Sequence, residues 1–243
     1  MNQGYLERES KRVNEAARKR GTRLLIVGAC LIALIYFLMR DSLDFKDPSN
    51  QTVVYCMIGL VGLLLLGFVA QLLRSRPAVN GKNLILPFEE GTKEAVGKLI
   101  DREASEGKIQ VEEYIDKSAT GKKAYDEKIV LLPSYLLLCG NRWEHKITAI
   151  PRDKIYWICA QDGHKGGNFI VRLLIFTEKK IFTVEGVDTG YLHRIAEQLY
   201  QYIPNVFREY DPFSFPYELE ELYTKNREGF LRFYEEEKKK QGF

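Results

Sequence analysis

Two apolar runs dominate the beginning of the chain, Leu24–Met39 and Thr52–Leu73, and neither contains Asp, Glu, Lys or Arg. A helix rises about 1.5 Å per residue and must cross roughly 30 Å of hydrocarbon. The second run is long enough for that, and the first is a few residues short, a deficit that snorkelling of Arg23 and Arg40 can make up. The pattern predicts a transmembrane α-helical hairpin. The alternative, a buried hairpin in a large soluble protein, is disfavoured by the short polar loop between the runs.

The charges beside the two runs predict an orientation. Residues 1–23 carry seven basic and three acidic side chains, residues 40–51 carry two and three, and residues 74–83 carry three and none. Lys and Arg next to a span stay on the cytoplasmic side. We therefore expect a multi-pass protein of the cell membrane, with two spans and both termini in the cytoplasm. The basic cluster of the first segment either only fixes this topology or also binds anionic lipid headgroups: Arg18, Lys19, Arg20 and Arg23.

Beyond residue 91 the hydrophobic period is first helical and then extended. Thr92–Glu106 predicts a helix capped by Thr92 and ended by Gly107. Seven short apolar or β-branched runs bounded by Gly, Pro, Asn or Ser then predict strands: 109–115, 125–132, 135–139, 145–150, 154–160, 168–176 and 180–184. Asp188 or Thr189 begins an amphipathic helix that ends at Pro204. The tight connections favour antiparallel pairing.

These patterns divide the chain into five parts: a basic cytoplasmic arm (1–23), a transmembrane hairpin (24–73, with spans 24–39 and 52–73), a linker (74–91), a domain with a preceding helix (92–204), and an aromatic strap with a terminal helix (205–243). The aromatic strap is expected to lie across the domain, and a partner-binding peptide is the alternative. The terminal helix, 217–240, docks either on its own chain or on another one.

Seven antiparallel strands followed by one helix resemble the pleckstrin-homology-like (PH-like) barrel. The segments Ile150–Ile158 and Tyr217–Tyr223 are similar to parts of uncharacterised bacterial membrane proteins that have an N-terminal transmembrane hairpin and a cytoplasmic PH-like domain. The resemblance implies a membrane α-helical hairpin plus an α+β cytoplasmic domain. That domain would be a seven-stranded antiparallel PH-like barrel capped by a helix, with flanking helices. The group brings no settled activity to carry over.

PH-like folds that bind inositol phosphates use clustered Lys and Arg in their first hairpin. Here that hairpin contains Lys117, Lys122 and Lys123, which makes them candidate contacts for a lipid headgroup. A solvated turn is the alternative, because Asp126 and Glu127 follow at once. Gly121-Lys122 lacks the earlier glycine and the hydroxyl residue of a P-loop, so nucleotide binding is not expected there.

The candidate chemistry is sparse. His145, His164 and His193 have no metal-ligand spacing, and no Ser or Cys has the local sequence of a nucleophile. We expect no catalytic residues, no cofactor and no metal site. The four cysteines are interpreted as buried small hydrophobes: Cys30, Cys56, Cys139 and Cys159. From Leu84 onward there are 24 basic and 27 acidic residues, which argues against nucleic-acid binding.

Together these observations predict a membrane-anchored binding or scaffolding protein that is not an enzyme. Its partners would be the lipid bilayer, anionic headgroups or a membrane protein, and its anchor would raise the local concentration of such a partner. The alternative is an accessory or sensing subunit of a membrane enzyme or transporter complex.

Overall fold

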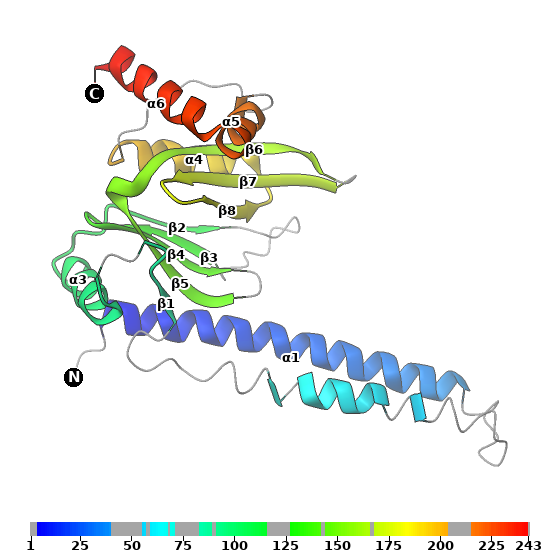
Figure 1. Cartoon of the computed structure of the whole chain (residues 1–243). Helices are drawn as coiled ribbons and strands as arrows, with labels where there is room; N and C mark the ends of the chain where they lie inside the picture. The colour runs from blue at the N-terminus through cyan, green and yellow to red at the C-terminus, as the bar shows by residue number, and fades with distance from the viewer. Residues whose placement is uncertain are drawn as a thin grey trace. The chain divides into compact units, whose positions relative to one another are not determined.

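A computed structural model of the chain describes residues 4–39, 55–56, 59–67, 69–70, 83–88, 91–115, 127–141, 144–165, 168–203 and 215–242 (Figure 1). The chain divides into two compact units. Unit 1 comprises Met1–Ser10 and Val79–Phe243, and unit 2 comprises Lys11–Ala78.

Unit 2 is helical where it is described. Most of helix α1 (Tyr5–Met39) belongs to it, and residues 55–56, 59–67 and 69–70 are also helical. Leu64 packs against α1, since a Cβ added at Gly28 would lie 3.1 Å from Leu64 Cδ2. Several apolar side chains of α1 are more than half exposed: Ile26, Val27, Leu31, Leu34 and Phe37.

The predicted membrane hairpin is contradicted. In the parts of the chain that the structure describes, no helix combines the length and the apolar character that a membrane crossing requires. Leu24–Met39 is the second part of α1, whose first part carries many charges. The second run is described only at residues 55–56, 59–67 and 69–70, and its other residues lie outside the described ones. The predictions of two spans and of a cell-membrane location are therefore wrong.

Unit 1 contains two β-sheets. The first has five strands in the order β1-β5-β4-β3-β2, in which β1 runs parallel to β5 and the other neighbours are antiparallel. Its strands are β1 (Leu84–Ile85), β2 (Val111–Ile115), β3 (Glu127–Leu131), β4 (Tyr135–Asn141) and β5 (Glu144–Pro151). The second is an antiparallel sheet of three strands, β6 (Ile155–Lys165), β7 (Asn168–Thr177) and β8 (Ile181–Gly186). A 3-10 turn, η2 (Arg152–Lys154), connects one sheet to the other.

The helices of unit 1 begin at side chains that satisfy free backbone N–H groups. Thr92 accepts from Ala95 N–H at the start of α3 (Lys93–Ser105), and Asp188 accepts from Tyr191 N–H at the start of α4 (Thr189–Tyr200). Both caps confirm the sequence prediction. The expected single terminal helix is instead two, α5 (Phe215–Lys225) and α6 (Arg227–Gln241), because Asn226 interrupts it and caps α6.

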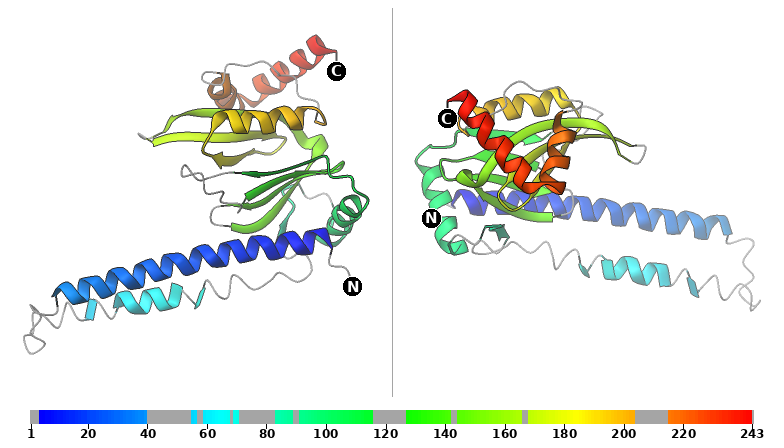
Figure 2. Two further views of the ribbon diagram at one scale, coloured as in Figure 1. Left: turned by 180° about the vertical axis from the view of Figure 1, so that it is seen from behind. Right: turned by 45° about the horizontal axis from the view of Figure 1, so that its top comes forward.

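Two apolar clusters hold these elements together. The larger one joins inward-facing residues of both sheets to α4, and it includes Ile129, Leu136, Ile158, Leu173 and Ile195. The second cluster lies on the other face of β6–β8, where Trp157, Leu174 and Phe176 meet side chains of α5 and α6. Both views of Figure 2 accordingly show α5 and α6 on the side of β6–β8 that faces away from the five-stranded sheet. The terminal helices thus dock on their own chain.

The predicted PH-like barrel is also contradicted. Each of the seven runs expected to form strands overlaps one of the strands β2 to β8. Yet the described strands form two separate sheets and do not close into a barrel. Two features account for the difference. β1 adds a parallel strand at the edge of the first sheet, within the expected linker 74–91, and η2 separates β5 from β6.

Candidate functional site

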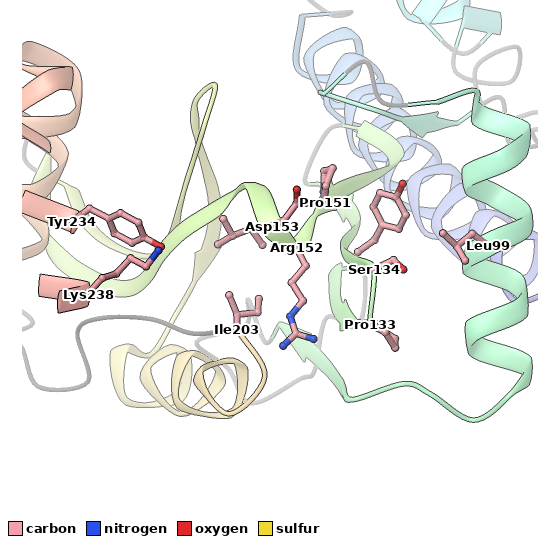
Figure 3. Close-up of a pocket in the computed structure, with 11 residues that line it drawn as sticks. Leu99, Pro133, Ser134, Pro151, Arg152, Asp153, Ile203, Tyr234 and Lys238 are labelled. Atoms are coloured by element: carbon pink, nitrogen blue, oxygen red, sulfur yellow. The ribbon is translucent and has the colours of Figure 1, made fainter. Parts of the chain in front are cut away.

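A pocket of about 790 Å³ lies in unit 1 where the chain passes from the five-stranded sheet to the three-stranded one (Figure 3). The residues that line it come from α3, the β3–β4 turn, the adjoining ends of β4, β5 and β6, η2, the turn after α4, and α6: Leu99, Pro133, Ser134, Tyr135, Pro151, Arg152, Asp153, Ile155, Ile203, Tyr234 and Lys238. The pocket therefore depends on the tertiary fold of unit 1 and on no single element.

A buried carboxylate holds the β3–β4 turn in place. Glu103 of α3 is 6% exposed and accepts hydrogen bonds from the hydroxyl of Ser134 and, at 3.3 Å, from its backbone N–H. The carbonyl oxygen of Ser134 accepts from Arg152 N–H at 3.1 Å. Glu103 thereby links α3 to the turn, and the carbonyl of Ser134 links the turn to η2. These polar groups form the frame of the pocket.

Arg152 brings a half-buried cation to the pocket. Its Nη1 donates to the neutral amide oxygen of Gln110 at 3.3 Å. Within the described part of the chain, no carboxylate lies at ion-pair distance from its guanidinium. Burial lowers the pKa of Arg152, because the charged form loses hydration. A guanidinium has five N–H donors, so most of its donor capacity is open to a ligand.

Helix α6 supplies a second cation and an aromatic hydroxyl. Tyr234 is 7% exposed, its ring centroid lies 5.0 Å from that of Tyr156, and burial raises its pKa to about 12. The Nζ of Lys238 lies 5.4 Å from the Tyr234 ring centroid, within cation–π range, and 4.0 Å from the carboxylate of Glu235. This distant ion pair is weak. Lys238 is therefore a second donor at the pocket, held by α6.

A separate buried cluster lies on β3. The Nζ of Lys128 donates to Glu9 Oε1 at 2.5 Å, to Glu112 Oε1 at 2.7 Å and to the Tyr5 hydroxyl at 3.3 Å. Burial alone would lower the pKa of Lys128, but its bonds to the two carboxylates outweigh burial and raise it. A lysine held in its charged form is a poor nucleophile. The cluster attaches the start of α1 to the sheet.

The basic residues predicted to contact a lipid headgroup lie partly outside the described residues and partly on α1. Lys117, Lys122 and Lys123 lie outside the described residues. Lys19 and Arg23 are exposed on α1, which also contains Arg18 and Arg20. Lys19 and Arg23 are not among the residues that line the pocket.

The prediction that all four cysteines are buried is confirmed for two of them and wrong for the other two. Cys139 and Cys159 are buried as predicted, whereas Cys30 and Cys56 are exposed, contrary to the prediction. His193 forms a surface pair with Glu197 at 3.3 Å. Among the described residues, no group of His, Cys, Asp and Glu is arranged to hold a metal ion.

Sequence reasoning missed Arg152 and Lys238. One signal pointed toward Arg152: the charged triplet Arg152-Asp153-Lys154 follows a proline between two apolar strands. Such a triplet marks an exposed connection, which is where binding residues concentrate. Nothing in the local sequence of Lys238 distinguishes it from the neighbouring charges of the terminal helix.

Comparisons of this chain with models of known protein families, with curated proteins and with solved structures found no match. The resemblance to bacterial membrane proteins with a PH-like domain therefore gains no support from relatives. Any function must be argued from the geometry of the chain itself.

Proposed function

We propose that unit 1 is a non-catalytic binding module that takes a small-molecule ligand in the pocket at η2. This keeps the binding role expected from the sequence and drops the membrane anchor. The observation that carries the proposal is the composition of the pocket wall. A space of about 790 Å³ combines apolar side chains with a few polar groups, which is typical of ligand sites.

The hydrogen bonding of the wall favours binding over catalysis. The hydroxyl of Ser134 is engaged by Glu103, and the backbone N–H of Arg152 is engaged by Ser134. The carboxylate of Glu103 also accepts from the backbone N–H of Ser134, so it holds the turn as well as the hydroxyl. The other groups of the wall include the donors Arg152 and Lys238, the exposed Asp153 and apolar side chains, a set that suits the orienting of a bound molecule.

A fragment screen by ligand-observed NMR tests the proposal, using the full chain and a matched pair of variants. Leu99→Trp adds an indole at a half-buried pocket residue, whereas Lys98→Trp places the same ring at an exposed neighbour whose side chain is 76% exposed. We expect some fragments to bind the wild type and Lys98→Trp but not Leu99→Trp. Fragments that bind all three proteins alike, or none at all, would refute a ligand site in this pocket.

A further inference from the structure

We infer that the pocket at η2 recognises ligands that join an anionic group, phosphate or carboxylate, to an apolar body, with Arg152 as the main anion contact. This inference rests on the proposed function and names the ligand class of that site. Three observations carry it: a guanidinium that has no carboxylate at ion-pair distance among the described residues, a second cation on α6, and apolar side chains in the same pocket wall.

The guanidinium of Arg152 is the first of these. It is partly removed from water, yet its described polar contact is the neutral amide of Gln110 at 3.3 Å. A cation that loses hydration is costly unless an anion compensates for it. A planar guanidinium donates two parallel N–H bonds to a carboxylate or phosphate, and such charge-assisted bonds are about twice as strong as neutral ones.

The other charges at the pocket agree with an anionic ligand. Lys238 adds a second donor from α6, and its contact with Glu235, at 4.0 Å, does not neutralise it firmly. Asp153 is the carboxylate that lines the pocket, and it is exposed. Figure 3 shows its side chain pointing to the opposite side of η2 from the Arg152 guanidinium. The carboxylate therefore does not occupy the place that a ligand anion would take.

The apolar part of the ligand is inferred from the rest of the wall. Leu99, Ile155 and Ile203 line the pocket, and the last two are 4% and 1% exposed. Of these three, the half-buried Leu99 still presents apolar surface, which a fully hydrated anion such as free phosphate would leave in contact with water. An aromatic or aliphatic group attached to the anion would cover it and gain roughly 25 cal/mol per Å² buried.

Three probes of similar size test this assignment: phenyl phosphate, phenylacetate and the uncharged benzyl alcohol. Their dissociation constants are measured by NMR titration of the full chain. The variants Arg152→Gln and Lys238→Gln each remove one positive charge from the pocket wall. Arg194→Gln and Lys239→Gln are matched controls, because both residues are exposed and do not line the pocket. We expect at least one anionic probe to bind about tenfold more tightly than benzyl alcohol.

Arg152→Gln should raise the dissociation constant of that anionic probe about tenfold, a loss typical of one charge-assisted bond. Lys238→Gln should raise it less. The dissociation constant of benzyl alcohol should not change, which shows that the variant is folded and the pocket intact. Whether phenyl phosphate or phenylacetate binds more tightly identifies the anion.

Equal affinities for the three probes would overturn the inference, as would equal effects of Arg152→Gln and Arg194→Gln. In both cases the proposed binding function would survive if Leu99→Trp still removed the binding of benzyl alcohol. If Leu99→Trp affected no probe, the proposed function and the inference would fail together.

Discussion

Lys128 Nζ and Glu9 Oε1 lie 2.5 Å apart, although 119 positions of the sequence separate the two residues. The side chain of Lys128 is 1% exposed and that of Glu9 is 10% exposed. Removing two charges from water is costly, and the cost is offset only by close contacts such as these. The pair therefore fixes the start of α1 against β3, and Leu6 N–H adds a 2.7 Å bond to Asp101 of α3.

Replacing Lys128 with Met should strongly destabilise unit 1. The variant leaves Glu9 buried without its cation, and breaking a buried pair in this way costs about 3–5 kcal/mol. We expect about 3 kcal/mol, because the side chain of Glu112 is 40% exposed and can be hydrated instead. Urea denaturation measures the free energy of unfolding. The double variant Lys128→Met with Glu9→Leu should regain most of the loss, and a double variant as unstable as the single one would contradict this account.

The free energy of unfolding should decrease as the pH rises above 10, because buried tyrosines then lose their hydroxyl protons. Burial raises the pKa of Tyr234 from 10.0 to about 12, and burial also raises the pKa of Tyr5. A group whose pKa is higher in the folded state contributes its full stability below its unfolded pKa and loses it as the pH rises through the folded value. For Tyr234 this window runs from pH 10 to about 12.

Tyr234→Phe tests this pH dependence, because it removes the ionising hydroxyl and keeps the ring. The free energy of unfolding of the variant, measured across that window, should fall less steeply than that of the wild type. Parallel curves for the two proteins would show that Tyr234 does not contribute to the alkaline loss.

The bond between Glu103 and Ser134 should be needed for the pocket frame. Glu103→Ala leaves the hydroxyl and N–H of Ser134 without their acceptor, which costs about 1–3 kcal/mol for a buried group. Glu103→Gln keeps one acceptor oxygen and should cost less. Glu106→Ala, at the exposed end of the same helix, is the control and should behave like the wild type. Amide exchange of residues 134 and 135 should increase in Glu103→Ala alone, and equal exchange in both Ala variants would contradict this role.

Local patterns predicted the secondary structure well because its causes are local. The caps at Thr92 and Asp188 depend on contacts three residues along the chain. The seven strand runs follow from alternation and turn residues. β1 could not be predicted, because Leu84–Ile85 is too short to show a period and is a strand through its parallel pairing with distant β5.

The sequence predictions were wrong or incomplete where contacts between distant parts of the chain determine the structure. The run predicted at 154–160 extends to Lys165 because polar Gln161 and Asp162 find partners in Arg172 and Thr189. The pocket depends on several elements that are distant in the sequence and meet around η2, and local sequence does not encode those contacts. The burial of Lys128 has the same origin, since its partners come from α1 and β2.

A last prediction concerns the attachment of α5 to the three-stranded sheet. Arg172 Nη2 donates to Glu220 Oε2 at 2.5 Å, and Gln161 Nε2 lies 3.4 Å from the same oxygen. The side chains of Arg172 and Glu220 are 14% and 29% exposed, so the pair is only partly screened by water. Glu220→Ala leaves the cation of Arg172 on β7 without its carboxylate and should cost about 2 kcal/mol, below the range for fully buried pairs.

The neighbouring Glu221 provides the control. It pairs with Lys225 at 2.6 Å, but their side chains are 62% and 75% exposed, so Glu221→Ala should leave stability nearly unchanged. Urea denaturation compares the two variants, and amide hydrogen exchange along residues 217–225 should increase in Glu220→Ala alone. If the two variants lost equal stability, the apolar cluster of Trp157, Phe176 and Phe230 would suffice to hold the helix. The ion pair between Glu220 and Arg172 would then form when α5 docks on the sheet, without being required for that docking.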